Sequence, residues 1–357
     1  MKNIALLVYD ASLTGGAEHV AINLANAFSK THRVCLISTF LLGTFPKEID
    51  EKVSCFALSD KYEKIPFHLR KYGNRLKKIL IDNQVDILLS ITAGVVTLAV
   101  QGAKGTNTKV FYCEHSNLEN RTYGWKHVFR QFCGAAKADA VITLTERDRD
   151  NFIKVFKLPK EKVTAIPNWY SEVQTDRSYD NRSKKIISVG RLEPVKGYEY
   201  TLECARTVLE NNPDWIWDIY GEGSLHKELQ NAITAHSIDR LTLKGNVTNI
   251  KDIYPEYAFT VMTSRYEGLP LSLLEAQAAS LPIVSFDCPT GPSEIIVDGI
   301  NGFVVPQFDT NLLIEKVQEL ISSEKMRSDF SAHAQDRLPF YSKERVLGLW
   351  ESLFLQS

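Results

Sequence analysis

Short apolar runs recur along the chain and alternate with stretches in which apolar residues repeat at helical spacing. The first half contains such runs at residues 4–9, 34–38, 86–90, 109–113, 140–143 and 163–166. A second set follows at residues 185–189, 215–220, 241–243, 258–262, 282–286 and 302–305. Continuous apolar runs of this length are typical of strands buried on both faces, with helices as their connections. The pattern predicts an α/β protein made of two successive doubly wound units with parallel sheets.

A polar stretch without periodicity, at residues 171–183, separates the two sets of strands. We therefore expect an N-terminal domain over residues 1–170, a linker at 171–183 and a second domain over 184–340. The final stretch, 341–357, has apolar residues at helical spacing and must pack on something, but its pattern leaves open which domain receives it. A chain of 357 residues is long enough for two domains with separate cores.

The composition is that of an ordinary globular protein, with 44% hydrophobic and 24% charged residues. No apolar run approaches the roughly 20 residues of a membrane span, and the apolar start is too short for a signal peptide. The six cysteines show no C-x-x-C spacing, and several lie inside apolar runs. We expect core thiols in a reducing compartment, which favours a cytoplasmic protein.

Charge is distributed unevenly between the two halves. Residues 1–170 contain 24 Lys and Arg against 16 Asp and Glu, whereas the remainder contains 18 against 27. Cations cluster in an amphipathic stretch at residues 67–79, and a helix there could rest on an anionic membrane leaflet. The same pattern suits an ordinary surface helix, so both interpretations stay open. We expect no nucleic-acid partner.

Two carboxylates, Glu267 and Glu275, flank a predicted junction between a strand and a helix. The strand is the apolar run 258–262, and Pro270 suits the first turn of a helix. Eight helical residues span roughly 12 Å, which is about the reach of a nucleotide sugar. Gly268 permits close approach of a ligand, and the free N–H groups of a helix start attract a diphosphate. Acidic residues are also common as helix caps, so the spacing alone leaves a structural role open.

Two cations follow the predicted strand at 185–189. Arg191 and Lys196 come directly after its carboxyl end, where open parallel sheets bind their ligands. Arg can donate to two phosphate oxygens at once and Lys acts as a point charge, so together they can neutralise a diphosphate leaving group. Cations near turns are common on protein surfaces. Their conjunction with the segment 267–275 is what favours a binding site.

The first half offers two weaker signals. Gly15 and Gly16 open a helical stretch after the strand at 4–9, and a glycine pair there allows a tight turn and close ligand approach. The sequence does not have the G-x-G-x-x-G spacing of a dinucleotide fold, which disfavours a nicotinamide enzyme. His115 follows the strand at 109–113 and is a candidate for contacting the reacting group, although a solitary histidine is more often structural.

Metal-ligand patterns are weak in this chain. Asp148 and Asp150 formally satisfy a D-x-D pattern, but they fall in a charged helical stretch at 146–155, so we expect solvated surface. No group of His, Cys or carboxylates has the spacing of metal ligands. The sequence therefore predicts neither a metal nor a resident cofactor.

Four segments carry a resemblance that spans nearly the whole chain in order. These are the Gly15-Gly16 pair and residues 189–197, 267–275 and 291–302. Together they resemble family 4 of the retaining glycosyltransferases, which have the GT-B fold. The resemblance implies two Rossmann-like parallel-sheet domains facing across a cleft. The first domain would bind the acceptor and the second the nucleotide sugar, and the last helix, 341–357, would return to the N-terminal domain.

The resemblance also assigns residues to the donor. In chain order these are Gly15, Gly16, Arg191, Lys196, Asn246, Val247, Glu267, Gly268, Leu269, Pro270, Leu271 and Glu275. The two cations would hold the diphosphate, Glu275 the ribose hydroxyls, Glu267 and the backbone after it the sugar and phosphate, and residues 246–247 the base. The catalytic set would be His115, which would contact the transferred sugar, with Arg191, Lys196 and Glu267.

The activity that the resemblance implies is metal-independent transfer of a hexose or N-acetylhexosamine with retention of configuration. A UDP-linked donor and a polyprenyl-diphosphate-linked glycan acceptor are favoured, in bacterial surface polysaccharide or oligosaccharide assembly on the cytoplasmic face of the inner membrane. Residues Glu114 to Asn117 resemble the members with such acceptors. The departing diphosphate can take the acceptor's proton, so front-face attack requires no protein base, and a covalent route through Glu267 stays open.

Two alternatives remain at this stage. A GT-B epimerase or phosphorylase could act on the same kind of donor without a lipid acceptor. A nucleotide-sugar-binding partner of another transferase would be a non-enzymatic alternative, which the presence of both glutamates and both cations disfavours.

Overall fold

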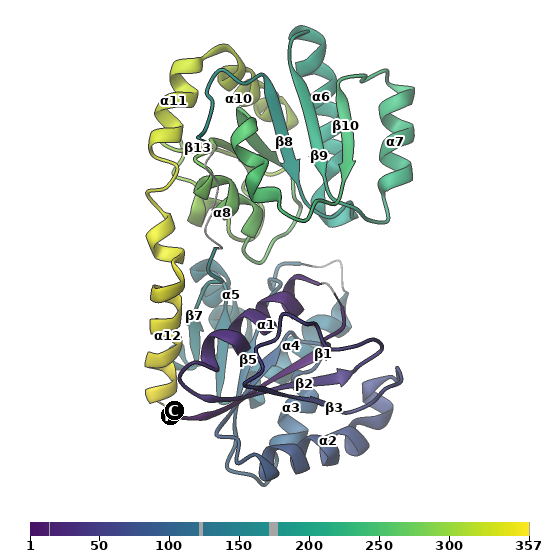
Figure 1. Ribbon diagram of the computed structural model, residues 1–357, viewed down its shortest axis with the longest axis vertical. Helices are drawn as coiled ribbons and strands as arrows, with labels where there is room; N and C mark the ends of the chain where they lie inside the picture. The colour runs from purple at the N-terminus through teal and green to yellow at the C-terminus, as the bar shows by residue number, and fades with distance from the viewer. Residues whose placement is uncertain (14, 121–123, 171–177, 357) are drawn as a thin grey trace. The chain divides into compact units, whose positions relative to one another are not determined.

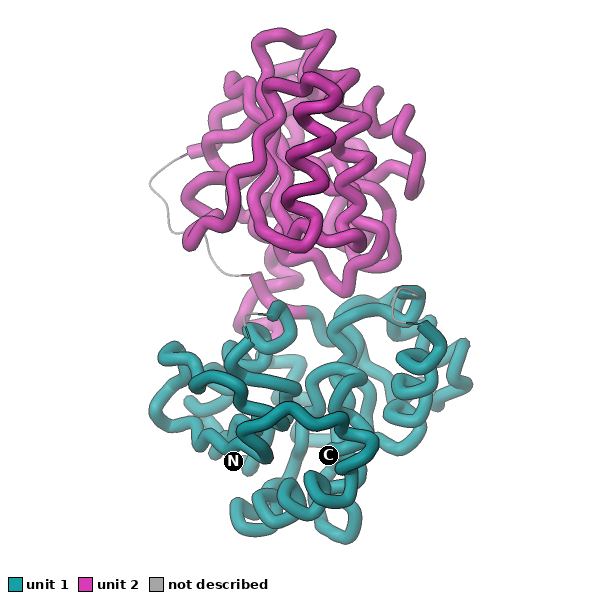
Figure 2. The backbone as a smooth tube through the Cα atoms, turned by 90° about the vertical axis from the view of Figure 1, so that its right-hand side faces the viewer, with its two compact units in different colours: residues 1–167, 347–357 teal, residues 168–346 magenta. Residues whose placement is uncertain are grey.

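The chain forms two compact units (Figures 1 and 2). The computed structural model describes residues 1–13, 15–120, 124–170 and 178–356. Unit 1 comprises residues 1–167 and 347–357, and unit 2 comprises residues 168–346. The division falls slightly before the expected boundary at residue 170. Much of the expected linker, residues 171–177, lies outside the described residues, so the linker stays a prediction.

In the described part of unit 1, seven parallel strands form one sheet in the order β3-β2-β1-β4-β5-β6-β7. The strands are β1 (Asn3–Asp10), β2 (Arg33–Phe40), β3 (Val53–Ala57), β4 (Ile87–Ile91), β5 (Lys109–Cys113), β6 (Ala140–Thr143) and β7 (Val163–Ala165). The chain runs outward from β1 to β3 and then returns to β4 on the other side of β1. The sheet is therefore doubly wound, with its topological switch point between β1 and β4.

The helices of unit 1 cover the sheet as connections between successive strands. They are α1 (Gly16–Phe28), α2 (Ile65–Asp82), α3 (Val96–Ala103), α4 (Trp125–Lys137) and α5 (Glu146–Phe156). The chain's last helix, α12 (Lys343–Leu355), begins in unit 2 and ends in unit 1. Its Trp350 and Phe354 rings lie edge-on or nearly so to Phe28 of α1, with centroids 5.9 and 5.3 Å away. These aromatic contacts supply the packing partner that the sequence pattern left open.

Unit 2 repeats the same topology with one strand fewer. Its described residues form a parallel sheet in the order β10-β9-β8-β11-β12-β13. The strands are β8 (Lys185–Val189), β9 (Ile216–Tyr220), β10 (Leu241–Gly245), β11 (Phe259–Met262), β12 (Ile283–Phe286) and β13 (Gly302–Val305). The helices are α6 (Tyr198–Asn211), α7 (His226–Ala235), α8 (Leu271–Ala278), α9 (Pro292–Ile295), α10 (Thr310–Ser322) and α11 (Glu324–Ala332). Here the switch point lies between β8 and β11.

The predicted fold class, two parallel Rossmann-like sheets in an α/β protein, is confirmed. Every run predicted to be a strand overlaps an observed strand. The sequence pattern missed β3, a short edge strand in which Ser54 and Ala57 are exposed. An edge strand has one neighbour and is partly solvated, so it lacks the continuous apolar run that identified the others.

The expectation for the D-x-D segment was wrong at Asp148. Its side chain is buried, and its Oδ1 accepts a hydrogen bond from the Leu118 N–H at 3.0 Å. The backbone N–H of Asp148 in turn donates to the Thr145 hydroxyl, which caps α5. Asp150 is exposed as expected. Asp148 thus links the start of α5 to the loop after β5 through hydrogen bonds.

The amphipathic stretch at 67–79 forms the middle of α2. Its apolar face is buried in the core of unit 1, through Tyr72 and Leu76 within the stretch and Ile65 and Leu80 on either side of it. Burial in the core uses the surface that could otherwise have entered a lipid leaflet, and the exposed cations of α2 face solvent. Throughout the described residues, each helix is too short or too polar to cross a bilayer. All six cysteines are free thiols, and four of them are buried.

Candidate active site

The loop after β8 brings Lys196 to the switch point of unit 2. Residues Pro194–Lys196 form one 3-10 turn, which ends at Gly197 in the left-handed conformation with φ 63°. A Cβ built on Gly197 would lie 2.3 Å from the Thr263 carbonyl oxygen at the end of β11. Only glycine permits both this conformation and this approach. The local sequence Lys-Gly therefore fixes the lysine beside the neighbouring strand.

Lys196 and Glu267 form a short ion pair. The Lys196 Nζ lies 2.6 Å from Glu267 Oε1, and the two side chains are only 18% and 11% exposed. The Ser264 hydroxyl donates to the same carboxylate oxygen at 2.6 Å. The loops that carry the pair are joined by the backbone, since Arg265 N–H donates to the Val195 carbonyl at 2.8 Å. Adjacent strands at the switch point thus place a cation and an anion side by side at the carboxyl edge of the sheet.

The start of α8 lies directly after this pair. The helix begins at Leu271, one residue later than the sequence suggested, and Pro270 is its N-cap residue. The backbone N–H groups of Gly268, Leu269 and Leu271 donate to no described residue. Free amides at a helix start carry partial positive charge and bind anions such as phosphate. The geometry therefore offers an anion site beside Lys196.

Thr290 and Gly291 hold this loop in place. Thr290 donates its N–H to the Glu267 carbonyl at 2.9 Å and its hydroxyl to the Gly268 carbonyl at 2.8 Å. Gly291 has φ 106°, and a Cβ on it would lie 2.5 Å from Pro270 Cδ. Sequence reasoning did not assign Ser264 or Thr290. Their positions could have indicated them: Ser264 lies three residues before Glu267, and Thr290 directly precedes the segment 291–302.

Glu275 occupies the second turn of α8, four residues after Leu271 and hence on the same side of the helix. Burial raises the pKa of this carboxyl, and the charge of Lys251 partly opposes that effect. Its carboxylate accepts no hydrogen bond from the part of the chain that the structure describes. A partly desolvated carboxylate with open acceptor positions suits ligand hydroxyl groups.

The remaining predicted donor residues of unit 2 lie at the same edge of the sheet but outside this cluster. Arg191 is exposed after β8, and Asn246 and Val247 are exposed after β10. Strand order places β10 two positions from β8, beyond β9. The structure therefore brings together Lys196, Glu267 and residues 268–271, and leaves Arg191 and residues 246–247 at the rim.

In unit 1, the predicted residues lie at the carboxyl ends of β1 and β5, which flank β4. Gly15 is the N-cap residue of α1, and a Cβ on Gly16 would meet no atom within 4 Å. The helix start is therefore uncrowded at Gly16, whereas the Glu18 carboxylate lies against Gly15.

His115 is partly buried after β5. Burial lowers its pKa to about 4, against the opposing charge of Glu114, so the ring is neutral at pH 7. Its Nε2 has no hydrogen-bond partner among the residues described. Glu114, which sequence reasoning did not assign, is buried and accepts from Gln131 Nε2 at 2.9 Å and from the Ser116 hydroxyl at 2.7 Å. These bonds fix the loop that carries His115.

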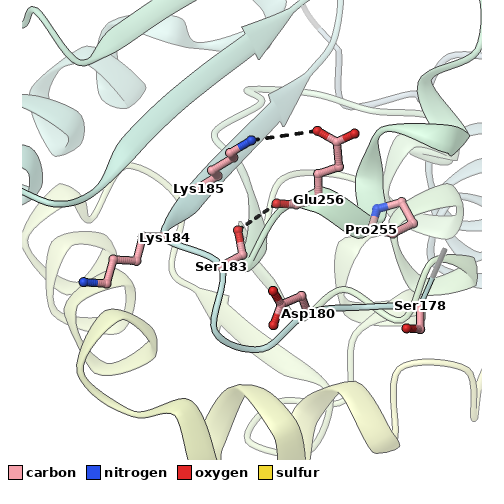
Figure 3. Close-up of a pocket in the computed structure, with 7 residues that line it drawn as sticks. All are labelled: Ser178, Asp180, Ser183, Lys184, Lys185, Pro255 and Glu256. Carbon is pink, nitrogen blue, oxygen red and sulfur yellow. Dashed lines mark hydrogen bonds and ion pairs between the residues drawn. The ribbon is translucent and has the colours of Figure 1, made fainter.

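The hollow drawn in Figure 3 lies away from these residues. It has a volume of about 730 Å³ and lies near the amino end of β8, opposite the end that carries Arg191. Its lining residues are Ser178, Asp180, Ser183, Lys184, Lys185, Pro255 and Glu256. Within the described ranges, no three His, Cys, Asp or Glu side chains converge into a group that could hold a metal ion.

Two doubly wound sheets, one with a helix start and a cation at its switch point, are typical of α/β proteins that bind nucleotides. Two family models match consecutive parts of the chain: "Glycosyltransferase Family 4" over residues 14–172 and "Glycosyl transferases group 1" over residues 173–337. The chain belongs to this glycosyltransferase family, whose members have the GT-B fold. The resemblance found in the sequence motifs is therefore confirmed, and the protein is a glycosyltransferase.

Several relatives match over almost their full length. The amylovoran biosynthesis glycosyltransferase AmsD of Erwinia amylovora is 26% identical over 358 residues, covering 99% of each chain. A Campylobacter jejuni enzyme is 25% identical over 96% of each chain. Its name is GalNAc-alpha-(1->4)-GalNAc-alpha-(1->3)-diNAcBac-PP-undecaprenol alpha-1,4-N-acetyl-D-galactosaminyltransferase. Among solved structures, S. aureus TarM in complex with Fondaparinux, alpha-GlcNAc-glycerol and UDP shares the fold, with TM-score 0.84 and 16% identity over 99% of this chain and 100% of that one.

Proposed function

We propose that the protein transfers a hexose or N-acetylhexosamine from a nucleotide diphosphate sugar to a glycan acceptor, with retention of configuration and without a metal. One observation carries the proposal: the Lys196 ammonium lies beside the free amides that open α8. A diphosphate placed there would meet the Lys196 ammonium, in competition with the Glu267 carboxylate, and several aligned N–H dipoles. This charge would stabilise the departing diphosphate in place of a metal ion.

UDP is the donor nucleotide that we propose. Support comes from the structural likeness to TarM, which was solved with UDP. Glu275 would bind the ribose hydroxyls, and the exposed residues Asn246 and Val247 would border the base. Gly15 and Gly16 of unit 1 would approach the diphosphate, and the neutral ring of His115 would contact the transferred sugar.

Front-face attack fits the state of Glu267 better than a covalent route. Its Oε1 already binds Lys196 and Ser264, which lowers the electron density available for nucleophilic attack. In the front-face reaction, the bond from C1 of the sugar to the diphosphate breaks and a bond from C1 to the acceptor oxygen forms on the same face. The acceptor's proton passes to the diphosphate oxygen that leaves. The atoms balance without a protein base.

We further propose a lipid-linked acceptor, in the assembly of a bacterial surface polysaccharide or oligosaccharide at the cytoplasmic face of the inner membrane. The support is the two relatives, one named for amylovoran biosynthesis and the other for an undecaprenol-linked acceptor. The basic surface of unit 1 would meet that membrane.

Replacement of Lys196 by Ala tests the proposal. We expect kcat/KM for sugar transfer to fall by about a hundredfold to a thousandfold, because charge developing on the diphosphate loses its cation. The matched control is Lys227→Ala, an exposed position on α7. UDP should raise the melting temperature of the wild type and of the control, and much less that of Lys196→Ala.

Four outcomes would contradict the proposal. These are wild-type turnover in the Lys196→Ala variant, an inverted anomeric configuration by NMR, loss of activity in EDTA, and a trapped glycosyl ester on Glu267. Consumption of the donor without an acceptor would instead favour an epimerase, and phosphate-dependent cleavage would favour a phosphorylase.

A further inference from the structure

Two buried threonine hydroxyls lie between the loop that carries Lys196 and the end of β11. Thr263 directly follows β11, Thr201 is in the first turn of α6, and the two residues are 2% and 1% exposed. Their Oγ1 atoms are 2.7 Å apart. Thr263 Oγ1 also lies 3.0 Å from the Gly197 carbonyl oxygen and 3.3 Å from that of Lys196. The two hydroxyls therefore reach the backbone of the lysine at the proposed donor site.

The direction of these hydrogen bonds follows from the hydrogens available. A threonine hydroxyl has one hydrogen to donate, whereas a carbonyl oxygen can only accept. Thr263 therefore donates its hydrogen to the carbonyl oxygens of Gly197 and Lys196, which share it. The hydrogen between the two hydroxyls then comes from Thr201. Thr201 thus orients the Thr263 hydroxyl so that it points its hydrogen at the lysine backbone.

The Thr263 hydroxyl supplies a donor where the sheet no longer does. Among the residues described, the backbone ladder between β8 and β11 ends before either loop begins. Past its last pair, the Arg265 N–H donates to the Val195 carbonyl at 2.8 Å. The Thr263 hydroxyl donates to the carbonyl on the other side, that of Gly197. Since Val195 and Gly197 are the two neighbours of Lys196, the segment after β11 fixes the lysine Cα from both sides.

The same segment also fixes the carboxylate beside the lysine ammonium. Ser264 lies between Thr263 and Arg265, and its hydroxyl donates to Glu267 Oε1 at 2.6 Å. The Lys196 Nζ binds that same oxygen at 2.6 Å. A lysine ammonium sits at the end of a flexible four-carbon chain, so its position is defined only where both its backbone and its partner are held. Three consecutive residues provide both constraints.

We propose that Thr263 is a positioning residue for the transfer reaction, and that it acts by holding Lys196 where the diphosphate departs. This inference rests on the proposed function, in which Lys196 stabilises the charge of that diphosphate. The Thr263 hydroxyl binds Thr201 and the backbone of the Lys196 loop, so its effect on the reaction passes through the lysine. Displacement of a catalytic group by about 1 Å can cost about a hundredfold in rate, so a small relaxation of the loop is enough to slow transfer.

Replacement of Thr263 by Val tests the proposal, because it keeps the shape of the side chain and removes the hydroxyl. We expect kcat to fall by about tenfold, with the donor KM changed by less than about threefold. The fall is in kcat because the charge on the diphosphate develops as its bond to the sugar breaks. Thr263→Ser retains the hydroxyl, so its kcat should stay within about twofold of the wild type.

Thr260→Val is the matched control. Thr260 is also a buried residue of β11, and its hydroxyl donates to the Ile187 carbonyl of β8 at 3.1 Å. Each valine variant leaves buried carbonyl groups without a donor, so both should lower the melting temperature by similar amounts. Only Thr263 reaches the Lys196 loop, so Thr260→Val should keep kcat within about twofold of the wild type.

A double-mutant cycle with Lys196→Ala separates positioning from a general loss of stability. If Thr263 acts through the lysine, Thr263→Val should change the residual kcat of the Lys196→Ala protein by less than about twofold. Equal falls in the two backgrounds would overturn the proposal. So would wild-type kcat in Thr263→Val, or an equal fall in Thr260→Val.

The outcome for Lys196→Ala alone distinguishes this proposal from the proposed function. Wild-type turnover in that variant contradicts the proposed function itself. A slow Lys196→Ala protein together with a normal Thr263→Val protein counts against the role of Thr263 alone. If Thr263→Val does not fold, Thr263→Ala takes its place, since the smaller side chain places no methyl group against the two carbonyls. Wild-type kcat in the folded alanine variant would equally refute the positioning role.

Discussion

At the residue scale, the central feature is the partnership of Lys196 and Glu267. Their sequence positions predicted that both belong to the site, but nothing in the local sequence indicated that the two side chains bind each other. The pair forms because β8 and β11 are neighbours at a switch point, which depends on the topology of the whole sheet. Contacts between distant segments of this kind do not follow from local spacing.

Glu275 provides a prediction on stability and pH. Burial raises its pKa from the ordinary value of 4.5, so the ionised form is less favourable in the folded protein than in the unfolded chain. The resulting destabilisation is absent below pH 4.5 and develops as the pH rises through the folded-state pKa. Glu275→Gln removes this penalty. We expect a melting temperature above the wild type at pH 7 and equal to it near pH 4, measured by scanning calorimetry.

The same substitution should weaken donor binding, because a neutral amide is a poorer acceptor for ribose hydroxyls. We expect roughly tenfold to hundredfold weaker UDP affinity by titration calorimetry. A matched control is Glu228→Gln, on the exposed surface of α7. If Glu275→Gln lowers the melting temperature at pH 7 and leaves UDP affinity unchanged, the carboxylate has a structural role.

At the element scale, helix contacts depend on glycines that sequence patterns treat as helix weakeners. Gly134 of α4 and Gly348 of α12 are both inside helices, yet their surroundings differ. A Cβ on Gly134 would collide with Val96, whereas one on Gly348 would meet nothing within 4 Å. The sequence predicted the strands well because buried parallel strands are continuous apolar runs. It could not predict which glycine allows close packing, since that depends on the neighbouring helix.

We therefore predict opposite effects for two glycine substitutions. Gly134→Ala should destabilise unit 1 by about 1–3 kcal/mol through overpacking. Gly348→Ala should be neutral or stabilise by up to about 1 kcal/mol, because alanine favours the helix. Urea denaturation followed by circular dichroism measures both.

A double-mutant cycle gives the control. Val96→Ala makes room for the new methyl group. The double variant Val96→Ala/Gly134→Ala should therefore lose less unfolding free energy than the two single variants lose together. Strict additivity would show that Gly134→Ala acts through something other than Val96.

At the scale of the whole molecule, unit 1 is built from two separate parts of the chain. Residues 347–357 complete it after the chain has passed through unit 2. The Glu351 carboxylate binds His32 Nε2 at 2.8 Å, and Phe354 covers Phe28. The amphipathic pattern predicted a final helix, but only the arrangement in space shows which surface receives it.

Adjacent residues at the end of α12 offer a matched test. Phe354 is 1% exposed and Leu355 is 84% exposed. Phe354→Ala should cost about 3–5 kcal/mol in the unfolding of unit 1, and Leu355→Ala almost nothing. Because the proposed donor residues of α8 belong to unit 2, UDP should still stabilise that unit in the Phe354→Ala variant. Equal melting curves for the two variants would rule out this packing.

The Glu267 carboxylate, which is held beside Lys196, also affects how small anions in solution compete for the site. Abundant small anions such as inorganic phosphate and sulfate must compete for Lys196 with the Glu267 carboxylate, which is part of the chain and therefore has a high effective concentration. An anion that makes only one weak contact gains little binding free energy when it displaces Glu267 from Lys196. A ligand that also accepts hydrogen bonds from the backbone amides after Glu267 would gain more than a small anion does, so we expect common salts to bind the empty site weakly.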